Sequence, residues 1–360
     1  MEILLNPGPV NLSKRVRQAL LKPDLCHREI EFSDLQQRIR ASLLDIYGLS
    51  HADWAAVLIT GSGTAAMEAM MVSLLPRVGK VLIIENGVYG ERLSRIAEIY
   101  NIPFQKLHFG WGEEIQTAAV ESALANGITH VALIHHETTT GRLNDLAKIT
   151  APCKTANIPV LLDGVSSFAA EAIEFTGWNL QACAATANKC LHGIPGTSFV
   201  ICRRDALQAA APGQRSLYLD LNTYVSQQDR GGTPFTQSVQ SFYALDEALS
   251  EHRDDGGWKA RRTQYRARMQ QIREGLEQLG IRALLPVGES SCILNSFYLP
   301  ENMDYQTLHD GLKARGFIIY AGQGGLVQSI FRIAVMGALT SDDIQRFLNA
   351  MREILKTRDN

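Results

Sequence analysis

The sequence lacks long apolar runs and a strong excess of either charge, and these absences exclude several classes of protein. No apolar run approaches the roughly 20 residues that cross a bilayer. The first ten residues lack the charged and apolar regions of a signal peptide. The formal net charge is −2, with both signs mixed along the 360 residues, so no basic nucleic-acid surface is expected. We therefore predict a cytoplasmic protein with neither a membrane nor a nucleic-acid partner.

Cysteines at the spacing of metal sites or redox motifs are also absent. The six cysteines are scattered, with no C-x-x-C pair and no histidines at metal-ligand spacing beside them. We expect free thiols in a reducing compartment and no bound metal.

Short apolar runs alternate with amphipathic segments through the middle of the chain, which is typical of a layered α/β sheet with parallel strands. The expected strands are 55–60, 80–85, 130–134, 159–163, 182–187 and 197–202, and the expected helices among them are 64–75 and 91–100. Beyond Gly256 we expect a long helix at 258–279, strands near 293–299 and 317–320, and a last helix at 341–356. The sequence thus predicts a large domain over residues 1–255 and a smaller α+β domain over 256–360.

Asp163 and Lys189 each follow a strand-like run, and open α/β sheets bind ligands at the carboxyl ends of their strands. Gly193 and Gly196 come soon after the lysine and leave room for a bulky ligand. A lysine can form a Schiff base with an aldehyde cofactor, and an aspartate can hold the proton of a pyridinium ring. Taken singly, a surface lysine and a helix-capping aspartate are the alternative interpretation.

Further motifs lie where predicted strands end. Residues 60–66 form a glycine-rich turn before a helix, which favours phosphate but lacks the G-x-G-x-x-G spacing of a dinucleotide site. The hydroxyls of residues 138–140 could bond a ring oxygen or a substrate, or could be capping groups in a loop. Tyr89 could stack on an aromatic cofactor or simply pack. Arg332 interrupts an apolar run, where its fork suits a carboxylate or a phosphonate, with a structural ion pair as the alternative.

Together these motifs resemble the class V, fold-type I aminotransferases, which depend on pyridoxal 5′-phosphate. The resemblance runs through nearly the whole chain and is carried by residues 6–9, 61–64, 86–92, 136–141, 163 with 166–168, 187–190, 215–217 with 219–221, and 331–333. The strings Glu-Thr-Thr-Thr-Gly, Ser-Ser-Phe and Ala-Asn-Lys-Cys are specific to the subgroup that exchanges an amino group between 2-aminoethylphosphonate and pyruvate. The resemblance implies that reaction, giving phosphonoacetaldehyde and L-alanine or running in the reverse, biosynthetic direction. It also implies a homodimer with shared active sites.

The resemblance implies a role for each matching residue. Lys189 would hold the cofactor as a Schiff base, and Asp163 would pair with its pyridinium nitrogen. Asn6 and Arg332 would bind the substrate, the arginine through the substrate's acidic group. The other implied cofactor contacts are Ser62, Gly63, Thr64 and Asn188 at the phosphate, Tyr89 and Thr138 at the ring, Val165 as a further contact, and Thr236 at the phosphate of the neighbouring subunit's cofactor.

Two stretches expected near the substrate, residues 24–32 and 231–237, depart from the subgroup's pattern. The amine and 2-oxo acid substrates therefore stay open, and a serine– or alanine–glyoxylate-type enzyme, or one for another phosphonate amine, is the alternative. A cysteine desulfurase is disfavoured by Asn188 before the lysine and by the absence of a cysteine at 322–325. A cofactor-binding regulator is disfavoured because the chain has no basic DNA-binding module.

Overall fold

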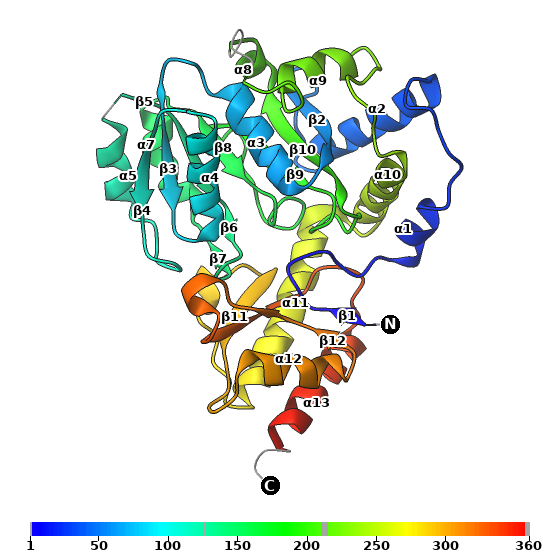
Figure 1. The fold of residues 1–360 in the computed structure, drawn as a ribbon, viewed down its shortest axis with the longest axis vertical. Helices are drawn as coiled ribbons and strands as arrows, with labels where there is room; N and C mark the ends of the chain where they lie inside the picture. The colour runs from blue at the N-terminus through cyan, green and yellow to red at the C-terminus, as the bar shows by residue number, and fades with distance from the viewer. Residues whose placement is uncertain (1, 126, 210–214, 357–360) are drawn as a thin grey trace.

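A seven-stranded sheet forms the centre of the larger, upper part of the molecule in the computed structural model, which describes residues 2–125, 127–209 and 215–356 (Figure 1). Its strand order is β2-β10-β9-β8-β5-β3-β4. The strands are β2 (Trp54–Gly61), β3 (Lys80–Glu85), β4 (Phe104–His108), β5 (Ile128–Ile134), β8 (Val160–Asp163), β9 (Leu180–Thr186) and β10 (Gly196–Arg203). Neighbours from β4 to β9 are parallel, whereas β10 is antiparallel to both β2 and β9. The predicted mostly parallel α/β sheet is confirmed.

Helices cover both faces of this sheet, which explains why its central strands read as almost continuous apolar runs. Within β3, Leu82 and Ile84 belong to one buried cluster, and Val81 and Ile83 belong to the other. The first cluster includes residues of α2 (Ile30–Asp45), α5 (Thr117–Leu124), α6 (Leu146–Ile149), α7 (Ala151–Thr155) and α10 (Val239–Asp254). The second includes residues of α3 (Gly63–Leu74), α4 (Val88–Ile99), α8 (Arg204–Ala209) and α9 (Leu221–Gln228).

The smaller, lower part is reached through the long helix α11 (Gly257–Glu277). Its antiparallel sheet has the order β11-β14-β13. The strands are β11 (Leu294–Tyr298), β13 (Tyr320–Ala321) and β14 (Ile330–Ala334), and α12 (Tyr305–Lys313) and α13 (Ser341–Lys356) complete the layer with α11. The turns Val287–Glu289 and Gly324–Leu326 are 3-10 helices. Phe297, Phe331 and Phe347 lie in the core of this part.

The N-terminal segment is attached to the smaller part (Figure 1). Its strand β1 (Ile3–Leu4) pairs in parallel with β12 (Phe317–Ile318). The single strand predicted near 317–320 was therefore wrong, since β12 bonds β1 while β13 bonds β14. An apolar run looks continuous in sequence even where its two halves bond different partners.

The predicted boundary near residue 255 falls between α10 and α11, and the division into domains at that point stays a prediction.

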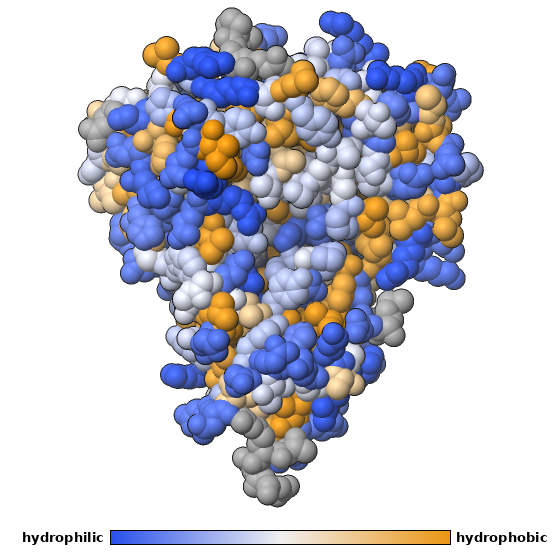
Figure 2. All heavy atoms as spheres, viewed as in Figure 1, coloured by the Kyte–Doolittle hydropathy of each residue, from blue (hydrophilic) through white to orange (hydrophobic). Residues whose placement is uncertain are grey.

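Three short elements complete the description of the chain. The strands β6 (His136–Glu137) and β7 (Arg142–Leu143) form an antiparallel pair, and α1 (Lys14–Ala19) packs on α10. On the surface, Figure 2 shows hydrophilic and hydrophobic residues interspersed over the face drawn, without one continuous hydrophobic belt. Among the described residues, no helix combines the length and the apolar character needed to cross a membrane.

Replacing Phe297 with alanine should strongly destabilise the smaller part. The ring is 1% exposed and stacks on Phe331 at 5.7 Å between centroids, so its removal leaves a cavity. We expect a loss of about 3–5 kcal/mol in the free energy of unfolding, measured by urea denaturation. The neighbouring Tyr298, which is 40% exposed, is the matched control, and Tyr298→Ala should cost well under 1 kcal/mol. Equal losses in both variants would contradict this account of the core.

Candidate active site

The carboxyl edge of the large sheet brings Asp163 and Lys189 together. Asp163 is the last residue of β8, and Lys189 lies three residues beyond the end of the parallel neighbour β9. Parallel strands end at the same edge of a sheet, so the two side chains meet there. Their electrostatic effects on each other's pKa agree with this proximity, since Asp163 raises the pKa of Lys189 and Lys189 lowers that of Asp163.

The N-terminal loop passes directly over Lys189. The lysine Nζ donates a hydrogen bond to the carbonyl oxygen of Pro7. A Cβ on Gly8 would lie 3.0 Å from Lys189 Cδ, and the φ of +108° at Gly8 also favours glycine. Asn6, at the start of the loop, is buried, and its Nδ2 donates to the Pro9 carbonyl at 3.1 Å. Its Oδ1 has no hydrogen-bond partner among the described residues, so the predicted substrate contact keeps a free acceptor at this position.

Burial disfavours the charged forms of both central groups, so it lowers the pKa of Lys189 and raises that of Asp163. Desolvation is the main cause that lowers the pKa of Lys189 to about 8, and the positive charges of Arg332 and Arg92 lower it further. Desolvation likewise raises the pKa of Asp163 to about 6, against the opposing effect of the Val165 N–H, which lies 2.8 Å from Oδ1. Asp163 Oδ2 has no hydrogen-bond partner in the part of the chain that the structure describes. The site thus combines an amine that can lose its proton near neutral pH with a carboxylate that has an open acceptor.

The N-terminus of α3 lies beside this pair. A Cβ on Gly63 would lie 2.9 Å from Val165 Cγ1, so the helix begins in contact with the loop after β8. Ser62 is the N-cap residue, but its side chain makes no capping hydrogen bond. The N–H groups of Gly63 and Thr64 have no backbone partner in the described chain. Free N–H groups, a free hydroxyl and the positive end of the helix dipole suit a phosphate.

Arg92, to which the sequence interpretation gave no role, adds a cation at the same place. Its Nη1 donates to Thr64 Oγ1 at 3.2 Å, and its guanidinium lies 4.6 Å from the centre of the Tyr89 ring. It also lowers the pKa of both Asp163 and Lys189. Arg92 follows Tyr89 by three residues on α4, so helical spacing alone could have placed the two side chains together.

Asn188, the residue before Lys189, is held by a hydrogen bond from Thr186 at the end of β9. Thr186 Oγ1 donates to Asn188 Oδ1 at 2.8 Å. This bond uses the amide oxygen, and the Asn188 Nδ2 has no partner among residues 2–125, 127–209 and 215–356. Asn188 therefore presents a free N–H donor beside Lys189.

The three threonines after β6 have different environments. Thr139 Oγ1 donates to Glu137 Oε1 at 2.6 Å and accepts from the Val88 N–H at 3.0 Å, so this hydroxyl caps α4 as the alternative interpretation had it. Thr140 Oγ1 is buried without a partner in the described chain. Thr138 is also buried, and its hydroxyl has no partner among the described residues, which leaves it free for a ligand.

Glu137 orders the start of α4 and was missed by the sequence interpretation. Its carboxylate accepts hydrogen bonds from the backbone N–H groups of Tyr89 and Gly90, at 3.2 and 3.3 Å. A Cβ on Gly87 would lie 2.3 Å from Glu137 Cδ, so the approach requires glycine. Desolvation is the main cause that raises the pKa of Glu137 to about 7. The predicted helix at 91–100 begins three residues earlier, at Val88, because this carboxylate and Thr139 satisfy its first N–H groups.

Arg332 enters the site from β14 of the smaller part. Its Nε donates to the Ala321 carbonyl at 2.8 Å and its Nη1 to the Thr138 carbonyl at 2.9 Å. The same Nη1 lies 3.2 Å from Gln323 Oε1. The arginine is 4% exposed, and within the described residues no acidic side chain pairs with it. The alternative of a structural ion pair is therefore not found there, and the guanidinium keeps Nη2 available for an anion.

Thr236 is the one predicted site residue that does not join this group within a single chain. It is exposed on the segment between α9 and α10. The segment is attached to the end of β2, where Gln237 Oε1 accepts from Thr60 Oγ1 at 2.9 Å. A contact of Thr236 with a neighbouring subunit stays a prediction.

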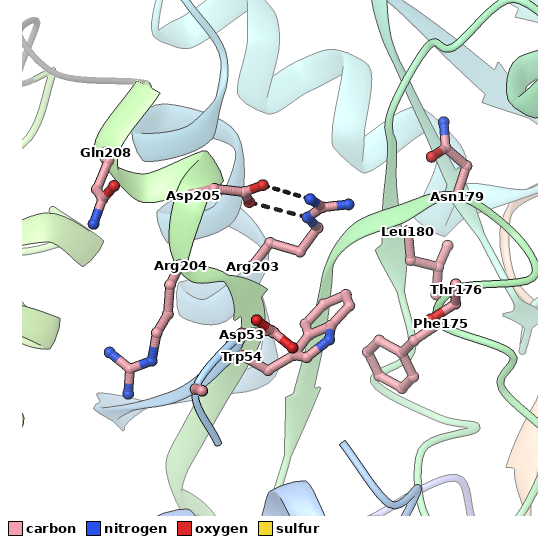
Figure 3. A pocket seen from close by; sticks show the side chains of 11 residues that line it. Asp53, Trp54, Phe175, Thr176, Asn179, Leu180, Arg203, Arg204, Asp205 and Gln208 are labelled. Carbon is pink, nitrogen blue, oxygen red and sulfur yellow. Dashed lines mark hydrogen bonds and ion pairs between the residues drawn. The ribbon is translucent and has the colours of Figure 1, made fainter. Parts of the chain in front are cut away.

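A separate hollow of about 470 Å³ lies at the opposite edge of the sheet (Figure 3). It is lined where β2 and β9 begin and β10 ends, by residues that include Trp54, Leu180 and Arg203. Figure 3 shows Arg203 paired with Asp205 inside the hollow. Because this cation already has its partner, and Lys189 lies beyond the other end of β9, the hollow is not the candidate site.

The residues at the carboxyl edge fit the expected cofactor, pyridoxal phosphate. The free Oδ2 of buried Asp163 suits a protonated ring nitrogen, and Lys189 supplies an amine for an aldehyde. The N-terminus of α3, with Ser62 and Arg92, suits the phosphate. Each of these groups has a hydrogen-bonding position that no described residue satisfies.

Replacing Asp163 with asparagine should stabilise the cofactor-free protein at high pH. The folded-state pKa of about 6 lies above the ordinary value of 3.8, so the folded protein binds more protons between these values. The resulting stability is fully present below pH 3.8 and is lost as the pH rises through 6. At pH 8 we expect Asp163→Asn to exceed the wild type by about 2–3 kcal/mol in the free energy of unfolding, an excess that shrinks toward pH 5. A variant that is less stable than the wild type at both pH values would contradict this electrostatic account.

Known proteins match this chain over nearly its full length. A family model described as aminotransferase class-V matches residues 22–347. The chain is 35% identical over 360 residues to a 2-aminoethylphosphonate–pyruvate transaminase of Vibrio vulnificus, covering 98% of this chain and 97% of the relative. It superposes on an aspartate aminotransferase from Thermus thermophilus with a TM-score of 0.90 at 27% identity, covering 99% of both chains. A ureidoglycine–glyoxylate aminotransferase from Bacillus subtilis, at 22% identity and a TM-score of 0.92, shares the fold, with 100% of this chain and 94% of that one covered.

Proposed function

The chain belongs to the class-V aminotransferase family, and on that basis we propose that it transfers the amino group of 2-aminoethylphosphonate to pyruvate. It is a pyridoxal-phosphate-dependent enzyme that acts on small amines and 2-oxo acids. The products of the proposed reaction are phosphonoacetaldehyde and L-alanine, and the chemistry is reversible. The names of the relatives that are 35% identical over nearly the whole chain support this pair of substrates.

The unpaired Arg332 is the observation in the site that carries the proposal. A buried cation without a counter-ion is unfavourable, and a ligand with a strong acid group removes that penalty. Desolvation lowers the pKa of the guanidinium, although an arginine keeps its charge in any ordinary pH range. Phosphonate and carboxylate groups both match its planar donors. Both proposed substrates carry such a group. In pyruvate the carboxylate is bonded directly to the carbon that exchanges nitrogen, and in 2-aminoethylphosphonate the phosphonate is one carbon away from that carbon.

When bound, the cofactor supplies an aldehyde carbon for the amino group and an electron-accepting ring. Lys189 would hold it covalently, and Asp163 would keep a proton on its ring nitrogen by offering the free Oδ2. Tyr89 would pack against the ring, with its backbone held by Glu137 and its own ring held by Arg92. The α3 N-terminus, Ser62, Thr64 and Asn188 would bind the phosphate, while Val165 and Thr138 would line the ring.

Lys189 is also placed to move protons. Its pKa of about 8 allows Nζ to exist as a free base in a useful fraction near neutral pH. Nζ would take a proton from the carbon that carries the donor's amino group, and it would return a proton in the half-reaction with pyruvate. Asn6 and Arg332 would orient the substrate so that this carbon faces the lysine. The low exposure of Asp163 and Arg332 keeps water from weakening these charge interactions.

Transfer of labelled nitrogen tests the proposed substrates directly. Cofactor-loaded protein is incubated with ¹⁵N-labelled 2-aminoethylphosphonate and pyruvate, and alanine is analysed by mass spectrometry. We expect ¹⁵N-alanine to accumulate with one phosphonoacetaldehyde for each alanine. Absence of label in alanine, with transfer from serine or alanine to glyoxylate in parallel assays, would replace this proposal with the glyoxylate-type alternative.

Removing the lysine amine should abolish the reaction. Lys189→Ala lacks both the covalent attachment and the proton carrier, so turnover should fall by at least about a thousandfold. The variant should also lack the visible absorbance of the lysine-bound cofactor. Lys154→Ala, at an exposed lysine of α7, is the matched control and should keep normal turnover. Normal turnover of Lys189→Ala would reject the assignment of this residue.

We further propose a cytoplasmic homodimer in which Thr236 reaches the cofactor phosphate of the partner subunit. The exposure of Thr236 and the firm attachment of its segment to β2 support a contact outside its own chain. Thr236→Val removes one hydroxyl donor, so cofactor affinity should fall about tenfold in a spectroscopic titration. Thr263→Val, at an exposed threonine of α11, should leave the affinity unchanged. A monomeric, fully active protein in sedimentation velocity would contradict the shared site.

A further inference from the structure

We propose that Gln323 determines the preference for a phosphonate over a carboxylate, by donating a hydrogen bond from its Nε2 to the acid-group oxygen that only a tetrahedral acid presents. The inference rests on the proposed function, because it concerns the acid group that Arg332 would bind. A carboxylate has two oxygens in one plane, and the flat fork of an arginine can match both. A phosphonate has a third oxygen outside that plane, and this oxygen requires a donor from another direction.

The contact between Gln323 and Arg332 determines which end of the amide is free. A guanidinium has only N–H donors, so the glutamine must turn its oxygen toward the arginine. Arg332 Nη1 accordingly lies 3.2 Å from Gln323 Oε1. The Gln323 Nε2 has no partner among the residues that the structure describes, and the side chain is only half buried. Gln323 therefore adds an uncommitted N–H donor next to the cation without adding charge.

The backbone holds Gln323 in this position from both sides. The Gly322 N–H donates to the Ile330 carbonyl at 2.9 Å, and the Leu326 N–H donates to the Gln323 carbonyl at 2.9 Å. A Cβ on Gly322 would lie 2.2 Å from the Leu326 carbonyl oxygen, so the tight turn requires glycine there. These bonds fix the backbone of Gln323, and the contact of its Oε1 with Arg332 restrains the amide, so the Nε2 donor loses less conformational entropy when it binds an oxygen.

The larger part of the molecule supports the same turn. Gly324 has a φ of +50°, and a Cβ there would lie 2.4 Å from Cη2 of Trp111. The Trp111 ring is in turn held by a hydrogen bond of 2.7 Å from its Nε1 to Glu91 Oε1. The turn from Gly322 to Leu326 is thus packed against the larger part while Arg332 bonds the Thr138 carbonyl. Gln323 and Arg332 are fixed relative to the residues that surround Lys189.

The preference that we infer comes from geometry and not from charge. Arg332 attracts either acid, so losing Gln323 should leave carboxylate binding unchanged. Only a ligand with a third oxygen should lose a hydrogen bond, and a hydrogen bond to a charged group changes affinity by about tenfold or more. A neutral donor that serves one acid and not the other is a source of specificity.

Binding of unreactive acids tests the inference separately from turnover. Dissociation constants of ethylphosphonate and propanoate are measured by titration calorimetry with the cofactor-loaded protein. In Gln323→Met the constant for ethylphosphonate should rise about tenfold, while that for propanoate should stay within twofold. Gln328→Met, at an exposed glutamine just beyond the turn, is the matched control and should change neither. Equal changes for both acids, or no change for ethylphosphonate, would overturn the proposal.

A second variant and a kinetic measurement complete the test. Gln323→Glu places a carboxylate against Arg332, so both acids should bind at least about tenfold more weakly. In the transfer assay, Gln323→Met should raise KM for 2-aminoethylphosphonate about tenfold with kcat within twofold, and KM for 3-aminopropanoate should be unchanged. Wild-type protein that favours ethylphosphonate but transfers no nitrogen from 2-aminoethylphosphonate would reject the proposed function alone. Wild-type protein that binds both acids equally well would reject this inference alone.

Discussion

Burial of charges without complete partners is the constraint on which the site depends. Asp163 and Arg332 are 3% and 4% exposed, yet each keeps one hydrogen-bonding atom that no described residue satisfies. Burying such groups is unfavourable. Burial therefore raises the pKa of Asp163 and lowers that of Lys189, which favours the neutral form of each. The remainder of the fold has to supply the free energy that keeps them in place. In the proposed complex, a cationic ring beside Asp163 and an anionic substrate beside Arg332 would remove these penalties, so binding of both would stabilise the folded protein.

The site is held by segments that are far apart in the sequence. The parallel strands β8 and β9 bring Asp163 and Lys189 to one edge, and the N-terminal loop lies over the lysine although 182 residues separate Pro7 from it. That loop is in turn tied to the smaller part, since β1 pairs with β12 and the Ala334 N–H donates to the Leu5 carbonyl at 2.8 Å. The smaller part thereby contacts the site through this loop, through β14 and through the turn that carries Gln323.

The sequence predicts correctly those features whose physical cause lies within one short segment of the chain. The central strands are short apolar runs because helices bury both of their faces, and their predicted bounds agree within two residues. Asp163 and Lys189 stand out because the first ends such a run and the second closely follows one. The carboxylate of Glu137 could not be assigned in the same way, because its partners on α4 lie 47 and 48 residues away. The contact of Lys189 with Pro7 and the division of residues 317–320 between two sheets could not be predicted for the same reason. Both depend on pairings between segments that are distant in the sequence.

The partners of Arg332 explain how one residue can be both fixed and available. A carboxylate partner would orient the guanidinium and also neutralise it, and it would then compete with the substrate's acid group. The carbonyl oxygens of Ala321 and Thr138 orient the guanidinium through its Nε and Nη1 without cancelling its charge. Because one carbonyl belongs to the smaller part and the other to the larger part, the cation is positioned only while the two parts keep this arrangement. Neutral partners drawn from both parts therefore leave a full positive charge available for the acid group of the proposed substrate, which no single acidic residue could do.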